Sequence, residues 1–186
     1  HPGPPSSHQA TEIQKWFWAT GVGQRYTGGG YHRNIVSDAK FFSSIASGSK
    51  ARFVFRDLLD PVVDIQSSQY ASRSARARAF FCLLASRNPK YLENGQPIAL
   101  DKAAINHSNK KHRHHIFPRA QLRKHFSAKA YNSLCNICFL VARDNLSIGK
   151  RLPRNYLDFY RDGSSKQFRQ VMRSHLIPVG ENDGVW

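Results

Sequence analysis

Residues 110–157 hold most of the chemistry that this chain offers, and they read KKHRHHIFPRAQLRKHFSAKAYNSLCNICFLVARDNLSIGKRLPRNYL. Two adjacent histidines, His114 and His115, lie in an apolar run that Pro118 ends. A run of this kind predicts a β-strand, and neighbouring side chains of a strand point to opposite faces. One imidazole can then bind a metal ion while the other stays available for proton transfer.

A second strand and a short helix are predicted further along the same stretch. The apolar run 137–141 contains β-branched and aromatic residues and begins directly after Asn136, which is typical of a strand. Asp144 is expected to cap a short helix that carries Asn145 and ends before Pro153. The order strand, loop, strand, helix therefore places histidines on the first strand and an asparagine on the helix.

This layout resembles the HNH, or ββα-metal, nucleases. The resemblance is carried by the His-His-Ile-x-Pro sequence that begins at His114, by Asn136 before the second strand, and by the Asp-Asn pair at residues 144–145. Within that group the chain is most similar to the C-terminal nuclease domain of bacterial phage-defence restriction proteins of the GmrSD and SspE kind. A weaker similarity extends to KWFWATGVGQRYTGGG at residues 15–30.

The resemblance implies a role for four residues of this sequence. His115 would be the general base, and Asn136 would hold the loop and His115 in place. His114 and the amide oxygen of Asn145 would bind a divalent metal, with Mg²⁺ expected in the cell. The commoner family pattern has Asp or Glu before the catalytic histidine and often His at the last position, so both ligands here are neutral. Because imidazole suits borderline metals, Mn²⁺, Ni²⁺ and Zn²⁺ remain open.

The charge of the chain points to a polyanionic partner. Lys and Arg number 28 against 12 Asp and Glu, which gives a net charge of +16, and nucleic acid is the usual polyanion in a bacterial cytosol. No apolar run approaches the length of a membrane span and no leader follows His1, so an excised piece of a cytoplasmic protein is expected. The residues expected to contact DNA are Arg119, Arg123, Lys124, Arg143, Lys150 and Arg151.

The expected fold class is α+β and mostly helical, a helical scaffold with a ββα-metal motif. With 186 residues, 40% of them hydrophobic, the chain is long enough for a real core. We expect a disordered tail or linker at residues 1–10, the helical scaffold at 11–106, the nuclease motif at 107–160, and a C-terminal helix within 161–186 that packs on the scaffold.

Two functions from different classes follow. The first is a metal-dependent DNA endonuclease or nickase domain that cuts double-stranded DNA in a restriction or phage-defence protein. Its full-length form would carry an N-terminal ParB-like nucleotide-hydrolysing domain. The second is a catalytically inactive nucleic-acid-binding module. One site per chain favours nicking unless the protein dimerises, and the sequence leaves the oligomeric state open.

The cysteines and Asn132 are not expected to belong to the site. Cys135 and Cys138 form a C-x-x-C pair, but only Cys82 remains, so a four-cysteine zinc site within one chain is impossible. We expect packed or partly exposed thiols. Asn132 precedes the second strand and is interpreted as a turn residue rather than a member of the site.

Overall fold

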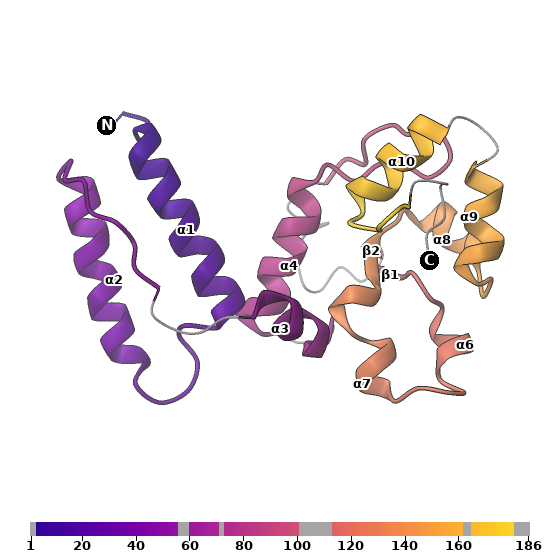
Figure 1. The fold of residues 1–186 in the computed structure, drawn as a ribbon, viewed down its shortest axis with the longest axis horizontal. Helices are drawn as coiled ribbons and strands as arrows, with labels where there is room; N and C mark the ends of the chain where they lie inside the picture. Colours follow the sequence, from indigo (N-terminus) through magenta and orange to yellow (C-terminus); the bar gives the residue numbers. More distant parts are fainter. Residues whose placement is uncertain (1–2, 56–59, 71–72, 101–112, 162–164, 181–186) are drawn as a thin grey trace.

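The computed structural model describes residues 3–55, 60–70, 73–100, 113–161 and 165–180 (Figure 1). These residues are mostly helical and include one two-stranded antiparallel sheet, which confirms the expected α+β class. None of the helices in these ranges combines the length and apolar character needed to cross a membrane. The elements in chain order are α1 (Ser7–Gly23), α2 (Tyr31–Ala46), α3 (Pro61–Ser67), α4 (Ala75–Ser86), β1 (Arg113–His115), α6 (Arg119–Leu122), α7 (Ala128–Tyr131), the 3₁₀ helix η2 (Leu134–Asn136), β2 (Ile137–Phe139), α8 (Ala142–Ile148), α9 (Pro153–Arg161) and α10 (Ser165–Ser174).

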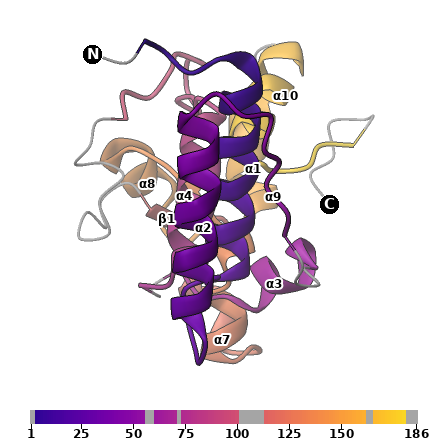
Figure 2. The same ribbon diagram turned by 90° about the vertical axis from the view of Figure 1, so that its left-hand side faces the viewer.

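Helices α1 and α2 form an antiparallel pair at the N-terminal end of the molecule (Figures 1 and 2). The Ser6 side chain accepts a hydrogen bond from the Gln9 N–H over 3.3 Å, and the Gln9 side chain accepts one from the Ser6 N–H over 2.7 Å. This reciprocal box satisfies two N–H groups that a helix start leaves open. Helix α1 therefore begins at Ser7, and the prediction of a tail or linker is wrong for residues 7–10.

The buried carboxylate of Asp38 joins α1, α2 and the turn between them. It accepts hydrogen bonds from Trp16 Nε1 over 2.9 Å and from the Tyr26 hydroxyl over 2.6 Å, and the Arg25 guanidinium donates to both oxygens over 2.9–3.2 Å. Burial by itself raises the pKa of Asp38, but the hydrogen bonds from Arg25, Tyr26 and Trp16 outweigh it and the pKa is lowered. Asp38 is therefore ionised, and its hydrogen bonds join α1, α2 and the turn between them.

The two-stranded sheet separates two hydrophobic cores. Alternate residues of a strand face opposite sides, so Ile137 and Phe139 join the core that contains α4, while Cys138 joins the core on the other face. The first core also holds Phe81 and Leu84, both almost completely buried. The register of the sheet pairs Arg113 with Phe139, His114 with Cys138 and His115 with Ile137.

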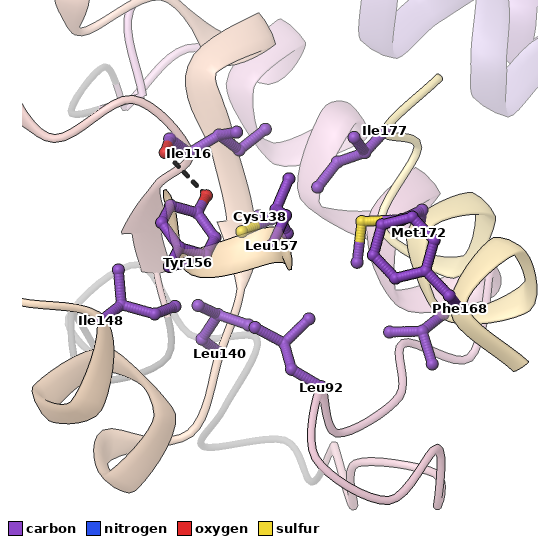
Figure 3. Packing of buried hydrophobic residues seen from close by; sticks show 11 residues of the cluster. Leu92, Ile116, Cys138, Leu140, Ile148, Tyr156, Leu157, Phe168, Met172 and Ile177 are labelled. Carbon is purple, nitrogen blue, oxygen red and sulfur yellow. Dashed lines mark hydrogen bonds between the residues drawn. The ribbon is translucent and has the colours of Figure 1, made fainter. Parts of the chain in front are cut away.

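The second core holds the C-terminal half of the molecule together (Figure 3). Tyr156 of α9 donates its hydroxyl proton to the carbonyl oxygen of Ile116 over 2.8 Å, which joins α9 to the residue that follows β1. Helix α10 is the helix expected to pack on the scaffold of residues 11–106. It contributes three side chains to this core, and Leu92 is the residue of that scaffold in the same core. The predicted boundary at residues 106 and 107 lies outside the described residues. The α10 members are Phe168, Val171 and Met172.

The crossing of α1 over α4 generates the first testable prediction. A Cβ atom built on Gly21 would lie 2.7 Å from the Cβ of Ala79, too close for two carbon atoms. Gly21→Ala is expected to lower the free energy of unfolding by about 1–3 kcal/mol through overpacking, offset in part by the roughly 1 kcal/mol by which alanine favours a helix. Chemical denaturation measures the difference.

Gly29→Ala is the matched control, because nothing lies within 4 Å of the Cβ position at Gly29. Its free energy of unfolding should stay within about 1 kcal/mol of the wild type. Equal stability of the two variants would show that α1 and α4 do not approach closely at Gly21.

Candidate active site

Strand β1 presents His114 and His115 to opposite faces of the sheet. His114 lies opposite Cys138 and is 7% exposed, whereas His115 lies opposite Ile137 and is half-buried. His114 and His115 therefore contact different residues, one on each face of the sheet.

His114 meets Asn145 on its side of the sheet. The Asn145 side chain, on α8, lies near enough to the His114 ring, on β1, to influence its pKa. Burial lowers the pKa of His114 to about 4, and this effect outweighs the interaction with the Asn145 side chain, which raises the pKa; the charge of a protonated His115 lowers it further. His114 is consequently neutral near pH 7, the form in which an imidazole nitrogen can bind a metal.

Helix α8 supplies Asn145 and begins after Val141. Val141 occupies the N-cap position without a capping side-chain bond, so the prediction that Asp144 caps this helix is wrong. Asp144 lies inside the first turn instead, is 2% exposed, and accepts a hydrogen bond from the Leu92 N–H over 3.4 Å. A carboxylate in the first turn is still favourable, because the helix dipole places partial positive charge there.

His115 meets Asn132 and Tyr70 on the other side of the sheet. Its Nε2 lies 3.1 Å from Oδ1 of Asn132, and its ring packs edge-to-face against Tyr70 with the centroids 5.0 Å apart. Because an amide oxygen can only accept, Nε2 carries the proton of this bond and Nδ1 is the basic nitrogen of the neutral ring. Burial lowers the pKa of His115, the bond to Asn132 raises it, and the positive charge of Arg119 lowers it.

Asn132 is the member of the site that the sequence did not reveal. It lies at the C-terminal end of α7, so the interpretation as a turn residue describes its backbone, but its side chain reaches His115. Its carbonyl oxygen also accepts a hydrogen bond from the Tyr70 N–H over 2.9 Å. Both partners come from distant parts of the chain. The sequence signal was weak, since an asparagine near a helix end is common in any fold.

Asn136 ties the turn after β1 to the end of α7. Its Oδ1 accepts from the Phe117 N–H over 2.8 Å, and its Nδ2 donates to the carbonyl oxygens of Phe117 over 3.1 Å and Tyr131 over 2.9 Å. These bonds run to main-chain atoms rather than to the His115 ring. Asn136 therefore joins the two ends of the segment between β1 and η2, and any effect on His115 passes through the backbone.

The donor set of His114 and Asn145 fits a divalent metal that accepts neutral ligands. Nε2 of His114 is buried without a hydrogen-bond partner among the described residues, and buried polar atoms normally have one. Coordination would satisfy that nitrogen. In the described part of the chain no three His, Cys, Asp or Glu side chains gather as a metal site. An ion held here would take its other ligands from water and phosphate oxygens.

Three of the cations expected to contact DNA follow β1 directly. Arg119, Arg123 and Lys124 are all exposed, in α6 and just after it. The Arg119 guanidinium lies over the Tyr131 ring at 5.6 Å and is close enough to His115 to lower its pKa. This group therefore lies beside the candidate base.

The other three cations lie at the two ends of α8, Arg143 in its first turn and Lys150 and Arg151 after its last residue. Lys150 is exposed, whereas Arg143 forms an ion pair with Glu93 between two exposed side chains. The Arg151 guanidinium donates to the carbonyl oxygen of Ile148 over 3.2 Å, which satisfies the C-terminal end of the helix. Arg143 and Arg151 thus have local partners, and a contact with phosphate would compete with these bonds.

The cysteines take no part in the site. Cys135 is exposed and Cys138 is buried, and in both cases burial raises the pKa of the thiol, for Cys138 to about 12. Cys82 is intermediate in exposure and its pKa is raised for the same reason. All three thiols are free, in agreement with the expectation of packed or partly exposed cysteines.

The low pKa of His114 predicts a loss of stability in acid for the metal-free protein. The folded-state pKa of about 4 lies below the unfolded value near 6.5, so the neutral ring stabilises the fold fully above pH 6.5 and this contribution is lost as the pH falls toward 4. Lowering the pH from 7 to 5 should therefore cost the wild type about 2 kcal/mol more than His114→Asn.

Urea denaturation at both pH values, in the presence of a chelator, measures this difference. His32→Asn is the control, because His32 is exposed and keeps its contact with water in both states. A His114→Asn variant with the acid sensitivity of the wild type would contradict the burial of a neutral His114.

The hydrogen bond from His115 to Asn132 predicts a shift that can be read without any assay of activity. Asn132→Leu keeps the side-chain size and removes the acceptor, so the pKa of His115 should fall further, because this bond raises it. Titration of the ring signals by NMR measures the shift, and Asn155→Leu on the exposed face of α9 is the control. An unchanged or higher His115 pKa would remove Asn132 from this role.

No family model, no curated protein and no solved structure matches this chain. The candidate site is therefore defined by the residues and contacts described above.

Proposed function

We propose that this chain is a metal-dependent DNA endonuclease or nickase domain of the HNH type. The observation that carries the proposal is the buried His114 of β1, whose Nε2 has no hydrogen-bond partner among the described residues and whose pKa is influenced by Asn145 of α8, next to a second histidine that faces the other side of the same strand. A protein that only binds DNA needs neither the paired histidines nor a neutral, buried imidazole. The net charge of +16 supports a nucleic-acid substrate.

The residues of the chain divide the work of phosphodiester hydrolysis. His115 accepts a proton from the attacking water at Nδ1, while Asn132 holds the ring through Nε2. General-base catalysis of this kind contributes about 10²–10⁴ in rate. His114 and Asn145 would hold the divalent ion, which supplies Lewis-acid stabilisation of the phosphate and of the departing oxygen. Asn136 keeps the loop between the strands in one conformation.

The exposed cations supply the affinity for the substrate. Arg119, Arg123 and Lys124 follow His115 within the next nine residues and would neutralise phosphates near the cut. Each such contact releases counterions, so binding should weaken steeply as salt rises. Arg143, Lys150 and Arg151 would extend this surface along α8 and past its C-terminal end.

The proposed biological setting follows the resemblance. The domain would belong to a cytoplasmic restriction or phage-defence protein, joined to an N-terminal ParB-like nucleotide-hydrolysing domain. One site per chain would nick one strand of duplex DNA. Mg²⁺ would be the metal in the cell, and Mn²⁺, Ni²⁺ or Zn²⁺ are alternatives for two neutral ligands.

A plasmid assay tests the proposal. Supercoiled DNA incubated with Mg²⁺ or Mn²⁺ should become open-circular, and a chelator should prevent the reaction. His115→Ala should lower the rate at least 100-fold, because the general base is lost. His32→Ala, at an exposed position of α2, should match the wild type. Intact plasmid in every lane, together with retained DNA binding, would leave the inactive binding module as the function.

The pH dependence of the same reaction tests the role of His115. A general base works in its neutral form, so the rate should rise with pH through the pKa of His115. Burial lowers that pKa, so the midpoint of the rise should lie below about pH 6.5. A rate that is flat from about pH 5 to about pH 9 would exclude His115 as the base.

A further inference from the structure

A basic cavity lies on the N-terminal helix pair, away from the candidate active site. It has a volume of about 590 Å³, within the range of small-ligand sites. It opens between α2 and the irregular segment 51–55, whereas β1 and β2 lie in the other half of the molecule (Figure 1). Its lining residues are Arg25, Arg33, Asn34, Ser37, Asp38, Phe41, Arg52, Phe53 and Val54.

The wall of this cavity is anchored to α1. The Phe53 N–H donates to the Glu12 carboxylate over 2.8 Å, and the His8 ring forms a hydrogen bond of 3.0 Å with the carbonyl oxygen of Ala51. Glu12 itself is only 3% exposed. Segment 51–55 is therefore fixed against the helix pair by a buried carboxylate, and the cavity it borders is part of the fold.

The charge balance of the cavity favours an anion. Its single lining carboxylate, Asp38, already accepts hydrogen bonds from Trp16, Tyr26 and Arg25. Arg33 and Arg52 are exposed, and neither forms an ion pair with any carboxylate in the described ranges. Their guanidinium groups are thus available, and the planar fork of arginine matches the oxygens of a phosphate.

An apolar surface lies beside these cations. Phe41 and Phe53 line the cavity, are partly buried, and pack edge-to-face with their centroids 5.4 Å apart. Aromatic side chains next to arginines suit a ligand that joins a charged phosphate to a flat, weakly polar base. Inorganic phosphate would contact the arginines but not the phenylalanine rings.

We propose that this cavity binds the phosphate of a nucleoside phosphate, with Arg33 and Arg52 holding the phosphate and the two phenylalanines meeting the base. This ligand chemistry occurs both in a free nucleotide and in a nucleic-acid strand. The inference does not depend on the nuclease activity, because none of the lining residues belongs to the candidate active site.

Calorimetric titration of the whole chain with AMP, adenosine, inorganic phosphate and a 12-nucleotide single strand tests the proposal. AMP should bind at least tenfold more tightly than adenosine and more tightly than inorganic phosphate. Arg33→Ala/Arg52→Ala should weaken AMP binding at least tenfold. Arg154→Ala/Arg173→Ala is the matched control, since it removes the same charge from exposed positions of α9 and α10 and should leave AMP binding unchanged.

The oligonucleotide distinguishes the two sources of the ligand. A tenfold loss that appears with the oligonucleotide alone, and only in the cavity variant, would support the site with a nucleic-acid strand as its ligand. Ser37→Glu provides an independent variant, because it adds a carboxylate at an exposed lining position and should repel the phosphate with both arginines intact. Equal affinities of the cavity variants and the control for every probe would overturn the proposal.

Discussion

The antiparallel pairing of β1 with β2 is the constraint on which the rest of the C-terminal half depends. Three residue pairs fix the register, and a shift by one residue would exchange the faces of His114 and His115. The same pairing decides which core each β2 side chain joins, because Ile137 and Phe139 face α4 while Cys138 faces the opposite core. A sheet this short is marginal alone, so the two cores that cover it provide its stability.

Burial gives the two histidines their chemical character. An imidazole in water is partly protonated near neutral pH, but both rings lie where the charged form is disfavoured, and the pKa of each is lowered. A lone pair is thereby available on each side of one strand. The two asparagines, Asn145 and Asn132, oppose this shift without reversing it, and the hydrogen bond from Asn132 also fixes the orientation of the His115 ring. Neutral carboxamides suit this purpose, because a carboxylate would stabilise the protonated ring.

The N-terminal helix pair is stabilised differently, around a buried charge. Its organising group is a charge, the Asp38 carboxylate, which is buried only because Arg25, Tyr26 and Trp16 surround it. Removing one partner of such a group is costly, whereas the complete set is stable. The helix pair meets the remainder of the molecule where Gly21 allows α1 to approach α4 closely. The two halves thus place cationic surfaces at separate positions on one molecule.

Local pattern was enough to predict the parts of the fold that depend on neighbours in sequence. The alternation of side chains along a strand separated His114 from His115, the apolar run after Asn136 gave β2, and the following polar segment gave a helix carrying Asn145. The mostly helical α+β class followed from the same periodicities. These features are set by backbone geometry over a few residues, which a sequence displays directly.

Contacts between distant segments decided what the local pattern could not. Asn132 reaches His115 because its backbone pairs with Tyr70, Asp144 accepts a hydrogen bond from Leu92 in place of capping α8, and Arg151 closes the end of that helix. Each of these side chains could form hydrogen bonds with several nearby groups. The bond that forms depends on which groups the folded chain brings within about 3 Å. The sequence determines which hydrogen-bonding side chains are present, and tertiary packing determines which groups they bond to.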